Sequence, residues 1–72
     1  MTVDDYMELP YPVVLLPEYD SGFSTHVPDL PGCFSQGDTA QEAYDNTRKA
    51  MYNWIKVTIE KGDLSVPEPS SR

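Results

Sequence analysis

The sequence has few of the residues that crosslink a small protein. It holds one cysteine, Cys33, and one histidine, His26, among 72 residues. A single cysteine cannot form an internal disulfide, and one cysteine with one histidine falls short of a structural zinc site. A chain of this size lies near the lower limit at which one hydrophobic core supports folding without disulfides or a metal site. Such chains often gain stability by self-association.

Long apolar runs and a basic, apolar N-terminus are missing as well. No segment approaches the ~18 apolar residues of a membrane span. The first ten residues, MTVDDYMELP, are acidic and do not resemble a signal peptide. We therefore expect a cytoplasmic protein.

Basic residues are absent from the first 47 positions, and the formal net charge is −7. Direct binding of nucleic acid requires clustered Lys and Arg, so we expect none by this chain. The acidic surface either keeps a small protein soluble or meets a basic partner. Nine acidic residues precede the first basic one, Arg48: Asp4, Asp5, Glu8, Glu18, Asp20, Asp29, Asp38, Glu42 and Asp45.

Three short segments have the composition of β-strands. YPVVLLPE at 11–18 is rich in β-branched and aliphatic residues, FSTHV at 23–27 alternates, and CFSQ at 33–36 follows a proline-rich connection. Pro12 and Pro17 cannot donate to a sheet ladder, so we expect them at strand ends or on a free edge. The turn-forming YDSG between the first two segments predicts an antiparallel hairpin.

A long helix follows the strands. Asp38 or Thr39 is the expected N-cap, Thr39 and Glu42 match a capping box, and Gly62 is expected to end the helix. We place Trp54 at the centre of the apolar arc. That arc comprises Ala43, Tyr44, Thr47, Ala50, Met51, Trp54, Ile55, Val57 and Thr58.

The element order predicts an α+β fold. It is a three-stranded antiparallel β-meander with one long helix packed on one face, a β-β-β-α order. We expect a single domain over residues 1–72, with an N-terminal extension at 1–9 and an extended tail at 64–72 that is able to add a short strand.

The first strand has apolar side chains on both faces. Val13 and Leu15 point one way, and Val14 and Leu16 point the other way. One helix covers only one face of a sheet, so a second subunit is the simplest cover for the other face. The sequence therefore predicts a homo-oligomer, a dimer or higher.

The polar arc of the helix carries a second candidate surface. Tyr52 and Ile59 lie seven residues apart there, near Arg48, and protein interfaces are enriched in aromatic residues and arginine. Scattered exposed apolar residues are also common without any function. The predicted protein-interface residues are Val14, Leu16, Arg48, Tyr52 and Ile59.

The segment VPDLPGCFSQGDT at 27–39 is consistent with a nucleophile loop, a ligand clamp or an architectural turn. A nucleophilic Cys33 needs a base, and strand alternation need not place His26 on its side. Buried, unreactive cysteine is the commoner state. Turn chemistry explains Asp20, Asp29 and Asp38 better than metal binding does. We expect no catalytic residue, no cofactor and no metal site.

VPDLPGCFSQGDT followed by AQEAYDNTRKAMYNWI resembles the HicB antitoxin family. Members carry a strand ending in V-P-D/E-L-P-G-C, then S/T-Q-G-D/E-T, then an E-A-rich helix. The flanks DYMELPYPVVLLPEYDSGF and GDLSVPEPSSR are similar to one branch of the family, so the resemblance runs from about Asp5 to Ser70. The sequence resembles the HicB N-terminal domain without the DNA-binding domain that many relatives carry.

The resemblance implies a partial ribonuclease H-like fold that has lost catalytic acids. It also implies a non-enzymatic antitoxin that neutralises HicA, a small basic mRNA endoribonuclease, by occluding its active site. The alternative is a stand-alone homo-oligomeric regulatory or scaffold protein without a toxin partner.

On this reading the motif is architectural. Pro28 and Pro31 stiffen the crossing, Gly32 and Gly37 permit tight backbone at the two ends of the third strand, and Cys33 fills the core. The motif residues are Pro28, Asp29, Leu30, Pro31, Gly32, Cys33, Gln36 and Gly37.

Overall fold

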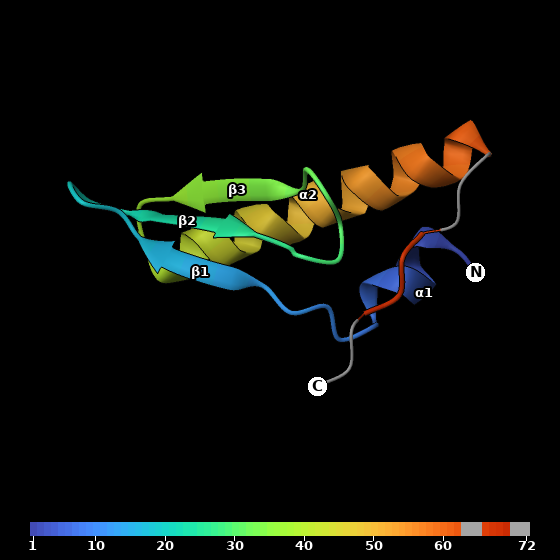
Figure 1. The fold of residues 1–72 in the computed structure, drawn as a ribbon, viewed down its shortest axis with the longest axis horizontal. Coiled ribbons are helices and arrows are strands. Elements are labelled where there is room, and N and C mark those ends of the chain that lie inside the picture. The colour runs from blue at the N-terminus through green and yellow to red at the C-terminus, as the bar shows by residue number, and fades with distance from the viewer. Residues whose placement is uncertain (63–65, 70–72) are drawn as a thin grey trace.

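The computed structural model describes residues 1–62 and 66–69. The three strands form one antiparallel sheet in the order β1-β2-β3, and the long helix α2 crosses one face of it (Figure 1). This confirms the predicted α+β meander, whereas kinship with ribonuclease H stays a prediction. None of the helices described is both long and apolar enough to cross a membrane. The elements are α1 (Val3–Met7), β1 (Val14–Pro17), β2 (Phe23–His26), β3 (Phe34–Gly37) and α2 (Ala40–Lys61).

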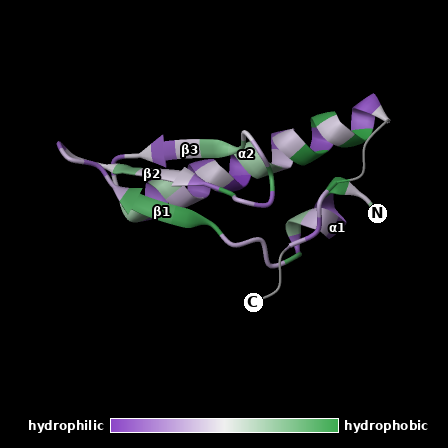
Figure 2. Ribbon diagram, viewed as in Figure 1, coloured by the Kyte–Doolittle hydropathy of each residue, from purple (hydrophilic) through white to green (hydrophobic). Residues whose placement is uncertain are grey.

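The first two strands are shorter than the predicted segments, and the third is shifted by one residue, from 33–36 to 34–37. β1 is the most continuously hydrophobic strand (Figure 2), yet it begins at Val14 rather than at Tyr11. Pro12 has no N–H for a ladder bond, and Tyr11 turns into the core, where it is 7% exposed. Pro17 is the last residue of this edge strand, as expected. Gly22 forms the β1–β2 turn with φ +84°.

Both predicted ends of α2 are observed, with one change at the start. The Thr39 hydroxyl accepts from the Glu42 N–H at 3.0 Å. The Glu42 carboxylate in turn accepts from the Asp38 N–H at 2.6 Å rather than from the Thr39 N–H. The capping box is therefore half formed, and its second bond is shifted by one residue. Gly62 ends the helix with φ +72°, and its N–H donates to the Ile59 carbonyl at 3.0 Å.

The buried stripe of α2 is narrower than predicted. Trp54 is only half-buried, so its expected place at the centre of the apolar arc is wrong. Tyr44 and Val57 are 43% and 48% exposed, so their assignment to the covered face is also wrong. A sheet of three short strands covers only one row of helix positions, four residues apart. The buried helix residues are Ala43, Thr47, Met51 and Ile55.

Small and polar side chains join α2 to the sheet at the Gly37 end. The backbones approach so closely that a Cβ at Gly37 would lie 2.4 Å from the Ala43 nitrogen. Beside this contact, the buried Thr47 hydroxyl donates to the Ala43 carbonyl at 2.6 Å and contacts the buried Thr25 hydroxyl of β2. Hydrogen bonding as well as close packing therefore holds the helix to the sheet here.

The apolar core lies at the other end of the sheet. The tail takes part in it, because Val66 is buried and the Tyr11 hydroxyl donates to the Pro67 carbonyl. Residues 66–69 lie beside α1 and form no strand, and the remainder of the predicted tail falls outside the part described (Figure 1). The buried core residues are Tyr11, Val27, Leu30, Cys33, Met51, Ile55 and Val66.

Helix α1 stands where only an N-terminal extension was expected. The Thr2 hydroxyl accepts from the Asp5 N–H at 3.2 Å, and the Asp5 carboxylate accepts from the Thr2 N–H at 2.9 Å. The hydrogen bond from the Thr2 N–H to the Asp5 carboxylate is the main cause that lowers the pKa of Asp5. Arg48 Nη2 donates to the Met7 carbonyl at 2.8 Å and so ties α1 to α2. A Thr-x-x-Asp pattern before Tyr6 and Met7 was the available signal.

Candidate functional site

The sheet has one face that α2 does not cover, which we call the open face. Thr25 is buried against Thr47 of α2, so its neighbours on β2 point the opposite way. The strand register aligns these neighbours with residues of β1 and β3 in two cross-strand rows. The open face comprises Val14, His26 and Phe34 in one row, and Leu16, Ser24 and Gln36 in the next.

The open face carries no carboxylate, ammonium or guanidinium group, and half of its six residues, Val14, Leu16 and Phe34, are apolar. Leu16 is 49% exposed and Phe34 is 67% exposed. Since the chain has a formal net charge of −7, an uncharged patch is a distinct local feature. Glu18 and Asp20 follow β1 directly and are both exposed, so they supply negative charge at one end of the patch. An uncharged surface that mixes apolar and polar side chains and is bordered by charge is typical of protein-binding surfaces.

The structure separates the predicted interface residues into different places. Val14 and Leu16 lie on the open face, as their strand positions indicated. Tyr52 and Ile59 are 41% and 37% exposed on α2. Arg48 is half-buried, and its guanidinium binds the Met7 carbonyl, so it has a structural contact of its own.

Sequence reasoning missed two members of the open face, Phe34 and His26. The sequence feature that could have identified them is their place beside buried residues in a strand with alternating side chains. Phe34 follows the core residue Cys33, and His26 lies between the buried Thr25 and Val27. Because side chains alternate along a strand, both residues had to point away from the helix.

The motif loop between β2 and β3 is closed by its own backbone. The Val27 N–H donates to the Cys33 carbonyl at 3.0 Å, the Leu30 N–H to the Val27 carbonyl at 3.0 Å, and the Cys33 N–H to the Leu30 carbonyl at 2.9 Å. The Leu30 side chain is fully buried. Hydrogen bonds within the loop therefore hold its backbone in a conformation that buries the side chains of Leu30 and Cys33 in the core.

Other motif residues have contacts or backbone conformations that support the same reading. Gly32 has φ +83°, a conformation that favours glycine. The Pro31 carbonyl accepts from Trp54 Nε1 at 2.9 Å, and the Gln36 carbonyl accepts from Asn46 Nδ2 at 2.8 Å. Both bonds attach the motif to α2. Pro28 lies exposed on the loop, and Asp29 is partly buried.

The described residues bring no catalytic set together. Cys33 is 4% exposed, and burial raises the pKa of its thiol, which favours the protonated and unreactive form. His26 lies on the open face, whereas Cys33 faces the core, so they are no catalytic pair. Within residues 1–62 and 66–69, no group of three His, Cys, Asp or Glu side chains is placed to hold a metal ion.

We expect the substitution Cys33→Ala to lower stability modestly, by roughly 1 kcal/mol, because it removes one buried sulfur from the core. Binding of a protein partner should be unchanged. Urea unfolding and a binding assay on the same preparation measure both effects. A folded Cys33→Ala protein that no longer binds its partner would contradict the architectural role of the motif.

An α+β scaffold with an uncharged, partly apolar sheet face is consistent with a small protein-binding module. The profile of the HicB-like antitoxin of bacterial toxin-antitoxin systems matches residues 11–71. The chain belongs to this HicB-like antitoxin family. An antitoxin of this family implies a toxin partner of the toxin-antitoxin kind, and it supports a regulatory rather than an enzymatic role.

Individual relatives agree with this assignment. A UPF0150 protein of Thermoplasma acidophilum is 33% identical over 61 residues, which cover 85% of this chain and 87% of that protein. A UPF0150 protein of Synechocystis is 41% identical over 59 residues, covering 82% of this chain and 75% of that protein. Antitoxin HicB 1 of Photorhabdus laumondii is 32% identical over 60 residues, covering 82% of this chain but only 39% of that protein.

Proposed function

We propose that this chain neutralises a small basic ribonuclease of the HicA type by placing its open face over the ribonuclease active site. The observation that carries the proposal is the exposed, uncharged sheet face of a strongly acidic member of an antitoxin family. On this proposal the chain acts in the cytoplasm, performs no catalytic step and binds no nucleic acid itself.

Charge and apolar area have separate roles in this mechanism. The net charge of −7 attracts a basic partner over a distance and raises the rate of encounter. Burial of the open face then supplies the affinity. Covering Phe34, which is 67% exposed, contributes roughly 3 kcal/mol at about 25 cal/mol per Å² of apolar area. Higher salt should therefore slow association more than it speeds dissociation.

The test is inhibition of RNA cleavage by a purified HicA-type ribonuclease from the genome that encodes this chain. Wild-type chain should abolish cleavage near a one-to-one ratio. Leu16→Glu should weaken inhibition about a hundredfold or more, because it buries an unpaired charge in the interface. Leu16 is 49% exposed, so the free chain should tolerate the change.

Tyr52→Glu is the matched control, since Tyr52 is similarly exposed but lies on α2. It should inhibit as wild type does. Equal inhibition by Leu16→Glu and wild type would overturn the open face as the docking surface. Absence of inhibition by the wild-type chain would overturn the proposed function.

We also propose that the chain self-associates. Support comes from its small size, the absence of a possible internal disulfide, and apolar side chains left exposed on several surfaces. This proposal is independent of the toxin, because either property can fail without the other.

A further inference from the structure

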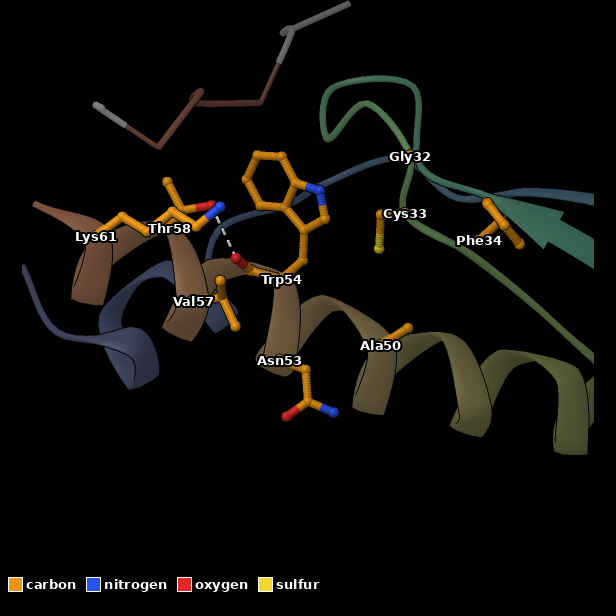
Figure 3. A pocket seen from close by; sticks show the side chains of 9 residues that line it. All are labelled: Gly32, Cys33, Phe34, Ala50, Asn53, Trp54, Val57, Thr58 and Lys61. Atoms are coloured by element: carbon orange, nitrogen blue, oxygen red, sulfur yellow. Dashed lines mark hydrogen bonds between the residues drawn. The ribbon is translucent and has the colours of Figure 1, made fainter. Parts of the chain in front are cut away.

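A groove lies beyond the Phe34 end of β3, between the motif loop and the C-terminal half of α2. The groove is open to solvent and has a volume of ≈ 590 Å³. Trp54 stands between α2 and the loop that carries Gly32, and Lys61 lies further along the helix (Figure 3). Part of the outer wall is apolar and accessible, because Val57 is 48% exposed. Lys61 is the one charged residue of the lining, so the groove is suited to an apolar group accompanied by a carboxylate.

The groove adjoins the edge strand β3, whose Gln36 carbonyl already accepts from Asn46 Nδ2 of α2 at 2.8 Å. In the described part of the chain, β3 pairs with β2 on one side and with no strand on the other. β3 (Phe34–Gly37) contains neither proline nor a charged residue, whereas the opposite edge strand ends at Pro17. The Val27 N–H donates to the Cys33 carbonyl, so the alternation of ladder bonds turns the backbone N–H and C=O of Phe34 outward.

We propose that a second copy of this chain pairs antiparallel with β3 about a two-fold axis near Ser35, and that its β1–β2 turn covers the groove. This surface rests on the proposed self-association and not on the toxin. Antiparallel pairing sets the Gly37 end of one strand against the Phe34 end of the other. The elements beyond these two ends of β3 therefore come into contact.

Those elements project from opposite ends of the sheet. The β1–β2 turn projects beyond the Gly37 end of β3, and α2 projects beyond the Phe34 end (Figure 1). The turn lies close to that end, since a Cβ on Gly22 would be 2.8 Å from the Gly37 carbonyl oxygen. It presents Tyr19, which is fully exposed in the single chain. The pairing brings this aromatic side chain to the apolar wall of a second copy's groove.

The charges are complementary. Asp20 in the turn and Asp38 after β3 lie at the Gly37 end, and both are exposed. In the proposed dimer these two carboxylates face the Phe34 end of the second copy. Lys61 supplies a positive charge there, although the chain as a whole is acidic. A basic protein would instead bring like charge to Lys61. A paired edge of four residues spans only roughly 13 Å, so the turn in the groove supplies most of the buried area and the dimer should be of micromolar affinity.

Sedimentation equilibrium of the full chain across the micromolar range tests this surface. Wild type should be in monomer–dimer equilibrium, and Val57→Glu should weaken the dimer about tenfold or more, because Val57 lines the groove. Leu16→Glu and Tyr52→Glu, which change other exposed apolar residues, should dimerise as wild type does. Circular dichroism confirms that each variant is folded.

A charge exchange makes the test specific. Lys61→Glu alone and the Asp20→Lys, Asp38→Lys double variant should each dimerise poorly, because each places like charges at both symmetric contacts. An equimolar mixture should form a heterodimer at least as tight as the wild-type dimer. A wild-type chain that stays monomeric would overturn both self-association and this surface. A dimer that Val57→Glu leaves intact, or a mixture that does not associate, would overturn this surface alone, and neither result bears on ribonuclease inhibition.

Discussion

Gly37→Ala should be among the most destabilising single substitutions in this chain. The added Cβ would lie 2.4 Å from the Ala43 nitrogen, 2.8 Å from the Ala43 Cα and 2.8 Å from the Glu42 carbonyl carbon. All three atoms belong to the backbone, so no side chain can move aside. The first turn of α2 must shift away from β3, which also disturbs the buried Thr25–Thr47 contact. We expect a loss of about 3 kcal/mol or more, a large part of the ~5 kcal/mol available to a small domain.

Urea unfolding measures this loss, and Gly32→Ala is the matched control. Gly32 has φ +83°, but a Cβ there would meet nothing within 4 Å. Its replacement should cost only the roughly 1–2 kcal/mol of an alanine in the left-handed region. Equal losses for the two variants would show that the close approach of β3 and α2 does not limit stability.

Leu30→Ala is expected to have the second large effect. Leu30 is fully buried among the apolar core residues and is held there by a loop whose backbone hydrogen bonds close on both sides of it. Truncation leaves a cavity that the rigid loop cannot fill, and such substitutions cost roughly 2–5 kcal/mol. For a domain of this size the thermal midpoint should fall by roughly 10 °C or more.

Thermal unfolding followed by circular dichroism measures this shift. Leu16→Ala is the control, because Leu16 is 49% exposed on the open face and should change the midpoint by no more than a few degrees. If Leu30→Ala melted within a few degrees of wild type, the buried Leu30 side chain would not be an important part of the core.

Local chemistry was sufficient to predict most of the fold. Alternation, proline positions and the YDSG turn located the three strands, and Thr39 and Gly62 located the ends of α2. Helix α1 was missed because five residues are too few for a stable isolated helix. Its stability comes from packing and from Arg48, which binds the Met7 carbonyl across 41 residues of sequence.

The side chain of Trp54 shows why periodicity alone was insufficient. A helical projection gives the direction of each side chain, but the width of the buried stripe depends on what lies above it. Here the backbones of β3 and α2 come closest at Gly37 and Ala43. The helix residues that face the sheet are therefore Ala43 and the residues at four-residue intervals after it, which include Met51. Trp54 is therefore placed at the side of the helix, where its indole N–H binds the Pro31 carbonyl.

The candidate site was predicted in part. The two apolar faces of the first strand indicated an uncovered sheet face, and Val14 and Leu16 lie on it. Phe34 and His26 required the cross-strand register, which depends on the length of each turn. The groove beside β3 depends on where α2 extends past the sheet, and no local pattern in the sequence contains that information.

The most direct test of the proposed antitoxin function is to map the bound surface by NMR. Backbone and methyl signals of the chain are followed while a purified HicA-type ribonuclease is added. The largest changes should fall on Val14, Leu16, His26 and Phe34, with the motif residues Leu30 and Cys33 and the exposed Tyr52 little affected. Changes centred on α2 or on the motif loop, with the open face unperturbed, would contradict the account.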